Sequence, residues 1–293
     1  MKYIIYHGNC YDGFTSAWVF EKARIANGEL AKNFKFISCN YGEAFPIENP
    51  NKEEDECYIL DFSFKRNIIL EQKDKFKKFM ILDHHVTAQE DLKDLDCCIF
   101  DMNVSGAKLT FRYLTDFYLD HEKRDILKRS EELVRLVEAV SDRDLFTFKL
   151  LGTSEYYYFM SSFDMTFENW DKICLTPFQE VLEKGTLIQH YERVYIRKTI
   201  SEKFYITLRD VNDNAYIMPC VNVTKEFGTN ACKAILNENP EINYACYFWI
   251  NKNGKFVFGI RSRDGYDCSI IAKNYGGGGH KQASGWIGGQ IEF

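Results

Sequence analysis

Five short apolar runs, separated by longer helical segments, dominate the first half of this 293-residue chain. The runs are residues 3–6, 34–37, 58–60, 79–82 and 97–100. Between the first two runs, apolar residues recur at helical spacing. Short apolar strands that alternate with helices are typical of a parallel sheet covered on both faces. The pattern therefore predicts an α/β domain with a parallel five-stranded sheet flanked by helices.

Polar side chains that are able to bind metal follow three of the predicted strands. His7 follows the first strand, Asp61 the third and Asp83 the fourth. Taken one at a time, each would be an ordinary loop residue. In open sheets of this kind, however, ligands bind beyond the carboxyl ends of the strands. The three positions together predict a ligand site at that edge of the sheet.

The sequence pattern changes near residue 195, after a predicted helix. Beyond this point the chain carries strand-like apolar runs at 205–208, 215–218, 245–250 and 255–260, then a short helix and a last strand. We therefore expect a first domain at 1–195, which includes the connecting helix. A smaller α/β domain with a mixed sheet is expected at 196–293.

The charge and composition exclude several classes of protein. A net charge of −6 argues against a protein that coats long duplex nucleic acid, because such proteins carry a basic surface. No signal peptide is visible, and no apolar stretch approaches the length of a membrane span. The ten cysteines form no CxxC pair and most lie in or beside apolar runs, which indicates reduced, buried thiols. We expect a cytoplasmic protein that binds no membrane, as a monomer or a homodimer.

Four segments carry the chemistry of the predicted site. They are residues 7–13 (HGNCYDG), 61–63 (DFS), 83–85 (DHH) and 141–144 (SDRD). Imidazole and carboxylate ligands together suit Mn, Fe, Zn or Mg, and the excess of carboxylates favours Mn or Mg. Two such ions can clamp a phosphoryl group and generate a hydroxide nucleophile at neutral pH. The segments therefore predict a metal-dependent phosphoesterase, in which Asp83 is expected to orient the histidine that binds metal.

In this order and spacing, the four segments resemble the DHH phosphoesterase superfamily. Residues 276–285 (GGGGHKQASG) are similar to the GGGH-x-x-ASG signature of its accessory DHHA1 domain. Members of the superfamily include RecJ-type exonucleases, oligoribonucleases (nanoRNases), family II inorganic pyrophosphatases and cyclic-dinucleotide phosphodiesterases. The resemblance spans nearly the whole chain, and among these members the oligoribonucleases are the ones that we expect it to be most similar to.

The resemblance implies two metal ions per chain, expected to be Mn²⁺, with Mg²⁺ or Co²⁺ as alternatives. His7 and Asp61 would bind one ion. The other ion would take Asp61 as a shared ligand and three further residues, which are Asp12, His84 and Asp142. Within the fourth segment Asp142 is preferred over Asp144, because family members place this ligand just after an apolar helix end, and Asp144 would support the loop.

His85 and Cys10 are the remaining residues of the predicted centre. The resemblance implies that His85 faces the scissile phosphate and helps to protonate the leaving group, with Asp83 in a supporting catalytic role. Many family members have an aspartate where this chain has Cys10. Cys10 could bind a soft ion, or Asn9 or water could fill the gap, or the first metal site could fill only when substrate is bound. The alternative is that Cys10 only packs at the end of the strand.

Substrate contacts are predicted at Ser105 and near the C-terminus. Ser105 precedes a helical pattern, so it is either a helix N-cap or part of a helix N-terminus that receives a phosphate oxygen. Four consecutive glycines are costly in backbone entropy, which favours a loop that lets the backbone approach a ligand over a merely flexible turn. The family resemblance implies that this loop and a nearby arginine hold the terminal nucleotide of the substrate. The residues concerned are Arg261, Gly277, Gly278, Gly279 and His280, whereas Arg263 could instead form a surface ion pair with Asp264 or Asp267.

The expected function is that of a two-metal phosphodiesterase. It would hydrolyse short single-stranded oligonucleotides or linear dinucleotides to nucleoside 5′-monophosphates. Some relatives also remove the 3′-phosphate of adenosine 3′,5′-bisphosphate, so this activity is expected as a second one. The alternatives are a phosphomonoesterase or polyphosphatase, and a non-catalytic nucleotide-binding protein that has lost its first metal through Cys10.

Overall fold

A computed structural model of the protein describes residues 1–288 and divides the chain into two compact units, Met1–Leu187 and Ile188–Phe293. The division falls inside helix α9 (Phe178–Ser201), whereas the sequence suggested a boundary near the end of this helix. The last five residues of the predicted second domain, 289–293, lie outside the described residues. Each unit is described by itself.

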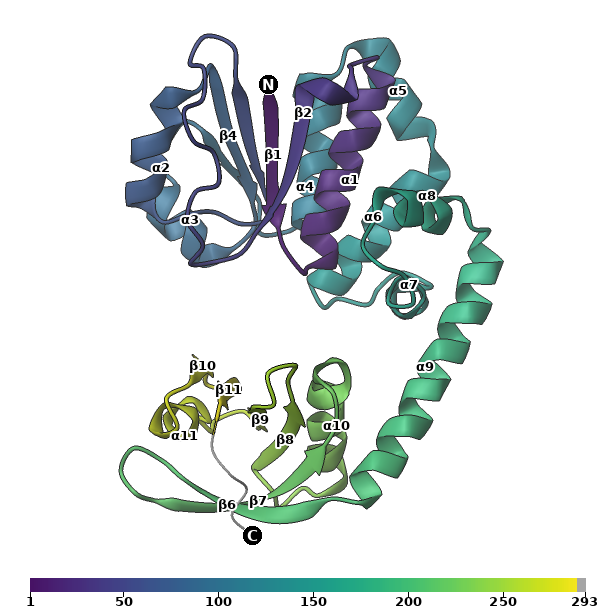
Figure 1. The fold of residues 1–293 in the computed structure, drawn as a ribbon. Helices are drawn as coiled ribbons and strands as arrows, with labels where there is room; N and C mark the ends of the chain where they lie inside the picture. Colours follow the sequence, from purple (N-terminus) through teal and green to yellow (C-terminus); the bar gives the residue numbers. More distant parts are fainter. Residues whose placement is uncertain (289–293) are drawn as a thin grey trace. The chain divides into compact units, whose positions relative to one another are not determined.

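The first unit contains the predicted parallel five-stranded sheet, in the order β2-β1-β3-β4-β5 (Figure 1). All four strand pairings are parallel. The strands are β1 Lys2–His7, β2 Phe34–Cys39, β3 Glu56–Leu60, β4 Lys78–Asp83 and β5 Cys98–Phe100. The strand order reverses between β1 and β3, because β2 lies on one side of β1 and all later strands lie on the other. Ligands of open α/β sheets bind at such a reversal, beyond the carboxyl ends of the strands.

Two hydrophobic cores cover the two faces of this sheet, as the period of a strand requires. Ile4 and Leu60 belong to one core, and their neighbours Ile5 and Ile59 belong to the other. The larger core is built with α1 Tyr11–Ala26, α4 Gly106–Tyr113, α5 His121–Arg129, α6 Glu131–Asp144, α7 Thr153–Met160 and α8 Phe167–Leu175. The smaller core is built with α2 Arg66–Gln72 and α3 Val86–Leu92 on the opposite face (Figure 1). Short one-turn segments η1 Ala31–Asn33 and η2 Lys73–Lys75, and the π-helical η3 Leu114–Tyr118, complete the unit.

The second unit is built on a mixed six-stranded sheet, as predicted, in the order β10-β11-β9-β8-β7-β6. The β7–β8 pairing is parallel and the others are antiparallel. Its elements are β6 Phe204–Arg209, β7 Ala215–Asn222, α10 Lys225–Glu238, β8 Tyr244–Ile250, β9 Phe256–Ser262, α11 Ser269–Asn274, β10 Gly278–His280 and β11 Ala283–Ile287. Within residues 1–288, no helix combines the length and apolar character needed to cross a lipid bilayer.

Candidate functional site

His7 is the last residue of strand β1 and lies beside a tight turn of the backbone. Strand β1 ends at His7 and helix α1 begins at Tyr11, so the chain reverses over three residues, in which Asn9 has a positive φ of 54°. Gly13 lies in the first turn of α1, where a Cβ atom would stand 2.4 Å from the backbone oxygen of His7. Only glycine therefore allows α1 to start this close to the end of β1.

Asp61 lies at the middle of the site, directly after β3. Its carboxylate is buried, with Oδ1 3.1 Å from His84 Nε2 and Oδ2 3.4 Å from His7 Nδ1. The Oδ2 atom has no hydrogen-bond partner within the described part of the chain. The backbone of Asp61 also has a positive φ of 63°. A strained backbone is typical of functional sites. A buried oxygen without a hydrogen-bond partner is a further sign of one, because such an atom can bind a metal ion or another ligand.

In the Asp83-His84-His85 segment, Asp83 contacts a different histidine from the one that we predicted. Asp83 ends β4 and is fully buried; its Oδ1 atom accepts the backbone N–H groups of His84, at 2.7 Å, and His85, at 3.2 Å. The same oxygen lies 2.7 Å from His85 Nδ1. We expected Asp83 to orient the metal-binding histidine, but the structure places it on His85. His84 is instead held by the carboxylates that surround its Nε2 atom.

Asp12 joins the site to the beginning of helix α4. Its two carboxylate oxygens accept the backbone N–H groups of Gly106, at 2.6 Å, and Ala107, at 2.9 Å. Ser105 is fully buried and caps the helix, since its Oγ atom accepts from Lys108 N at 3.4 Å. The structure thus shows the N-cap alternative for Ser105, and Asp12 accepts the N–H groups at the start of α4. A contact between Ser105 and substrate stays a prediction.

The structure places Asp144 beside His84, and not Asp142, which was the aspartate preferred from the sequence. Asp144 Oδ2 lies 3.4 Å from His84 Nε2. The Asp142 carboxylate instead accepts the backbone N–H groups of Lys149 and Leu150, both at 3.0 Å. It also accepts the hydroxyl groups of two threonines, Thr147 and Thr153. Asp142 thus holds the following loop, and Asp144 faces the site.

A signal for this arrangement was present in helix α6. Its buried positions Leu133, Val137 and Val140 define an inward face, and Asp144 continues this face at the spacing of four, three and four residues. Asp142 is two residues away, which rotates it by about 200° around the helix axis. The helical phase, rather than the end of the apolar run, therefore identifies the aspartate that faces the site.

Ligand atoms from these residues gather into three groups, each within 4.8 Å. The groups are His7, Cys10 and Asp61; Asp61, His84 and His85; and Asp12, His84 and Asp144. Asp61 belongs to two of them, as a bridging ligand would. Nitrogen and oxygen donors in this number suit Mn²⁺ or another first-row divalent ion. The residues present therefore fit divalent metal, and Cys10 lies where it could contribute a sulfur to the group around His7.

The pKa values of the carboxyl groups also favour the binding of a cation at this site. Burial and the negative charges of Asp61 and Asp144 raise the pKa of Asp12 well above its usual value. Burial and Asp61 likewise raise the pKa of Asp144. Burial would also raise the pKa of Asp61, but the nearby imidazoles of His7 and His84 lower it below the usual range. Carboxyl groups that oppose one another's ionisation in this way would be relieved by a divalent cation.

Gly106 is the residue that lets Asp61 approach helix α4. A Cβ atom at this position would lie 2.5 Å from Asp61 Cβ and 2.7 Å from its Oδ1. We expect Gly106→Ala to displace Asp61 and to cost about 1–3 kcal/mol of stability, as overpacking does. The displacement of Asp61 should also weaken the affinity for Mn²⁺, which isothermal titration measures. The control is Gly28→Ala, where a Cβ meets no atom within 4 Å but φ is +68°, so it should lose stability and keep metal binding. Undiminished Mn²⁺ affinity in Gly106→Ala would contradict this account of Asp61.

Two of the five predicted substrate residues of the second unit, Arg261 and Gly278, line a shallow hollow of about 340 Å³. Arg261 Nη2 donates to Thr229 Oγ1 at 2.7 Å, and the guanidinium lies 5.5 Å from the ring centre of Tyr247. Tyr247 stacks on Trp249, with ring centres 5.8 Å apart and planes 12° from parallel. The two aromatic rings were not predicted, although they alternate along one strand and so share one face of the sheet.

The glycine run is explained in part by local packing. A Cβ on Gly277 would lie 2.2 Å from Gly285 O, and one on Gly279 would lie 2.5 Å from Ala283 O. Gly278 differs, because a Cβ there would meet no atom within 4 Å, and His280 beside it is exposed. Two of the three predicted glycines thus have a structural reason, and Gly278 is the one with free space in front of it.

Arg263 has a structural role that the sequence did not suggest. Its guanidinium donates to the backbone oxygens of Leu236 and Asn239 at the end of α10, and to Ile242 O at 2.8 Å. Among the described residues it forms no ion pair, so the expected surface pair with a neighbouring aspartate is wrong. The arginine instead satisfies the last carbonyl groups of a helix.

One aromatic residue near the metal ligands was also missed. Tyr41 lies two residues after β2, and its ring centre is 5.3 Å from that of His7 and 6.2 Å from that of His85. The rule that ligands bind beyond strand ends, which identified His7 after β1, would also have identified this residue after β2.

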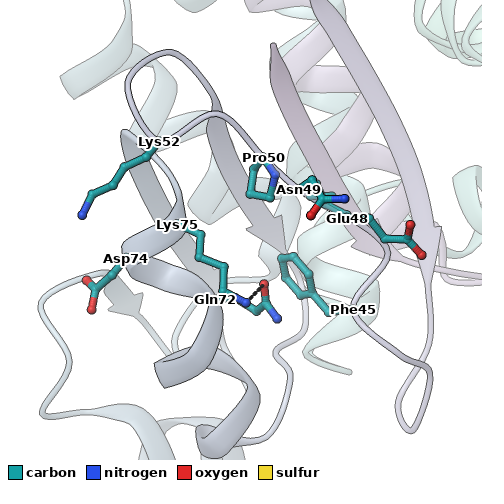
Figure 2. Close-up of a pocket in the computed structure, with 9 residues that line it drawn as sticks. Phe45, Glu48, Asn49, Pro50, Lys52, Gln72, Asp74 and Lys75 are labelled. Atoms are coloured by element: carbon teal, nitrogen blue, oxygen red, sulfur yellow. Dashed lines mark hydrogen bonds between the residues drawn. The ribbon is translucent and has the colours of Figure 1, made fainter.

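A separate hollow of about 720 Å³ lies away from these residues (Figure 2). Its lining comes from the segments that precede β3 and β4, among them Phe45, Pro50, Gln72 and Lys75. It therefore belongs to the edge of the sheet where the strands begin, opposite to the metal ligands. None of the three groups of ligand atoms contributes to it.

Comparison with known proteins supports the fold assignment. No protein-family model matches the chain. Uncharacterized protein R106 of Acanthamoeba polyphaga mimivirus is 29% identical over 296 residues, which covers 96% of this chain and 66% of that protein. The chain thus spans just under two thirds of the length of this relative.

Several solved structures share the fold at low sequence identity. Exonuclease RecJ bound to manganese superimposes with a TM-score of 0.52 at 12% identity, over 98% of this chain and 86% of RecJ. The pGpG-specific phosphodiesterase PggH of Vibrio cholerae gives 0.50 at 13%, over 98% and 92%. An exopolyphosphatase-related protein of Bacteroides fragilis gives 0.50 at 17%, over 100% and 87%. The chain therefore has the α/β fold that RecJ and the other DHH phosphoesterases share.

Proposed function

We propose that this protein is a metal-dependent phosphodiesterase of the oligoribonuclease type. Its substrates would be short single-stranded oligonucleotides or linear dinucleotides, and its products nucleoside 5′-monophosphates. The observation that carries the proposal is the convergence of three imidazoles and three carboxylates at the carboxyl ends of parallel strands. Solved structures that share the fold include an exonuclease and a phosphodiesterase of a linear dinucleotide, which supports this substrate class.

Two Mn²⁺ ions are the proposed cofactors, with Mg²⁺ or Co²⁺ as alternatives. His7, Asp61 and Cys10 would hold the first ion. Asp61 would be shared with the second ion, whose other ligands would be Asp12, His84 and Asp144. When bound, such ions supply a hydroxide nucleophile at neutral pH and neutralise the charge that develops on the phosphate oxygens.

His85 is the proposed proton donor to the leaving oxygen. Its hydrogen bond with the buried Asp83 raises the pKa of His85 above the usual value for histidine. At neutral pH a larger fraction of the His85 imidazole is therefore protonated than in a free histidine. Because Asp83 holds Nδ1, the Nε2 atom is the one left to face a phosphate.

The second unit would bind one end of the substrate. Arg261 is the proposed partner of a phosphate, and Gly278 and His280 present backbone and imidazole groups to the same ligand. Trp249, which is partly exposed and stacks on the buried ring of Tyr247, adds an aromatic surface on which a base could stack. In this division of labour the first unit hydrolyses and the second unit recognises the terminal nucleotide. A cytoplasmic location, and a monomer or homodimer in solution, remain predictions.

A substrate screen tests the proposal. The full chain is loaded with Mn²⁺ and offered the dinucleotide pApA, a five-nucleotide RNA, a cyclic dinucleotide, adenosine 3′,5′-bisphosphate and polyphosphate. We expect AMP from pApA and nucleoside monophosphates from the RNA, slower release of phosphate from the bisphosphate, and complete loss of activity in EDTA. Hydrolysis of pApA that persists in EDTA, or no hydrolysis of either nucleotide chain, would overturn the proposal.

Polyphosphate hydrolysis is the second candidate function. The fold similarity to an exopolyphosphatase-related protein favours it, because that protein's name refers to the hydrolysis of polyphosphate. In the screen this candidate predicts phosphate release from polyphosphate and none from pApA.

A further inference from the structure

The segment that follows Asp144 exposes an unusual group of apolar side chains. Phe146 is 63% exposed, Phe148 41%, Leu150 45% and Leu151 80%. Both phenylalanines also have positive φ angles, 57° and 49°, which bulky residues rarely adopt. The two phenylalanines are separated by one residue and their ring centres lie 4.9 Å apart, but both stay exposed, so burial does not compensate the strain and a functional reason is expected.

The strained backbone is held by an extensive set of hydrogen bonds to one residue. The backbone oxygen of Asp142 accepts from Thr147 N at 3.0 Å, and its carboxylate accepts from the N–H groups of Lys149 and Leu150. Thr153 Oγ1 donates to the same carboxylate at 2.5 Å. The loop 145–151 is therefore fixed in one conformation that presents its aromatic rings outwards.

Arg143 adds a positive charge to the aromatic group. Its guanidinium carbon lies 4.5 Å from the ring centre of Tyr157, 5.4 Å from that of Phe146 and 5.6 Å from that of Phe148. Arg143 forms no ion pair with any residue in the part of the chain that the structure describes. The cation is thus held by rings on several sides, and its charge acts on the neighbouring Asp144 carboxylate without an ion-pair contact.

This group is continuous with the candidate metal site. Arg143 and Phe146 flank Asp144, which lies 3.4 Å from His84. On the other side, the ring of Tyr157 is 5.7 Å from that of Tyr11, which lies between Cys10 and Asp12 in the chain. Aromatic rings beside a cation form a surface on which a base can stack while the cation contacts the neighbouring phosphate.

We propose that Arg143, Phe146 and Phe148 form a nucleobase shelf, on which a base of the substrate stacks while Arg143 contacts the adjacent phosphate. The shelf rests on the proposed function, since it takes the substrate to be a single-stranded nucleic acid. Stacking on aromatic rings tolerates every base, so the shelf would select nucleotides over other phosphate compounds without selecting a sequence. The shelf also gives a reason for the strained backbone. A loop that already holds the rings in place loses less conformational entropy when a base binds.

The test compares binding of two probes to the full chain. One is a fluorescent five-nucleotide oligoadenylate, and the other is the same sugar-phosphate chain with abasic residues. Binding is measured by fluorescence anisotropy with Ca²⁺ in place of Mn²⁺, which limits hydrolysis. We expect the wild type to prefer the oligoadenylate by about 5- to 150-fold for each stacked base. The double variant Phe146→Leu/Phe148→Leu should lose this preference and keep its affinity for the abasic chain.

Two further variants sharpen the test. Phe117→Leu is the matched control, because Phe117 is 74% exposed and distant in sequence from the shelf; it should retain the wild-type preference. Arg143→Gln should weaken binding of both probes by the same factor, and should reduce the slope of log affinity against log salt by about 1, as loss of one phosphate contact does. Thermal unfolding of each variant verifies that it is folded.

Three outcomes would overturn the shelf. The wild type could bind both probes equally, or the double variant could keep the preference. The double variant could also change only the oligomeric state in light scattering, which would make the loop an interface between copies of the chain. Failure of the proposed function is a separate result, because it appears as absence of hydrolysis of the oligoadenylate with Mn²⁺, whereas the Ca²⁺ binding measurement still decides the shelf.

Discussion

Replacing Asp61 by asparagine should reduce Mn²⁺-dependent hydrolysis of pApA by about a thousandfold or more. The carboxylate belongs to two of the three groups of ligand atoms, so its loss weakens both proposed metal sites. Metal ions contribute several kcal/mol to transition-state stabilisation, and each 1.4 kcal/mol corresponds to about a factor of ten in rate. Asparagine keeps the size of the side chain and tolerates the positive φ of this position, so the backbone should not change.

Metal content separates a loss of ligands from a loss of structure. After loading with Mn²⁺ and desalting, mass spectrometry should find about two ions per chain in the wild type and fewer in Asp61→Asn. Asp94→Asn is the matched control, because Asp94 is an exposed aspartate paired with Arg66, and it should retain both metal and activity. An Asp61→Asn variant with wild-type activity would overturn the proposed centre. A wild type that binds one ion or none would instead favour a non-catalytic nucleotide-binding protein.

The general position of the site could be predicted because two simple regularities act together. The alternation of strands and helices determines a parallel sheet, and parallel strands bring their carboxyl ends to the same edge. His7, Asp61 and Asp83 follow three different strands, so their meeting point does not depend on details of packing. The strand order β2-β1-β3-β4-β5 determines which of these strand ends are adjacent, but it does not change the edge of the sheet at which they lie.

The roles of individual side chains were harder to predict, because they depend on rotation around an element. His84 and His85 are adjacent in sequence, yet one meets the carboxylates of the site and the other meets Asp83. The sequence does not determine which of the two imidazoles a buried aspartate will hold. The answer depends on how β4 ends and where α3 begins, and both follow from tertiary packing.

The substrate residues of the second unit show a different difficulty. A run of four glycines suggests an approach of backbone to ligand, but Gly277 and Gly279 have their close neighbours on β11, across a strand pairing. A contact of this kind is invisible in the sequence, because it depends on register. The two alternatives for Ser105 stayed open for a similar reason: the sequence does not show that Asp12, far earlier in the chain, accepts the N–H groups that follow Ser105.

Asp144→Asn and Asp142→Asn should have opposite effects on activity and stability. Asp144→Asn removes a proposed metal ligand and should lower Mn²⁺-dependent hydrolysis by about a hundredfold or more, since the lost interaction is of the order of several kcal/mol. Its stability without metal should be unchanged or higher, because burial and the charge of Asp61 raise the pKa of Asp144 and disfavour its ionised form. Asp142→Asn should instead lower the free energy of unfolding by about 2 kcal/mol at neutral pH.

The stability effect of Asp142 follows from its pKa and carries a distinct pH dependence. Burial would raise the pKa of Asp142, but hydrogen bonds from Thr147, Thr153 and the loop backbone lower it to about 2. A lowered pKa stabilises the fold above the unfolded value near 3.9 and loses this contribution as the pH falls toward about 2. Urea unfolding from pH 7 to pH 3 should therefore show that wild type and Asp142→Asn converge in stability, while Asp144→Asn does not follow this course. If Asp142→Asn lost bound Mn²⁺ and Asp144→Asn kept it, the two aspartates would have to exchange their assigned roles, and the helical-phase argument for α6 would fail with them.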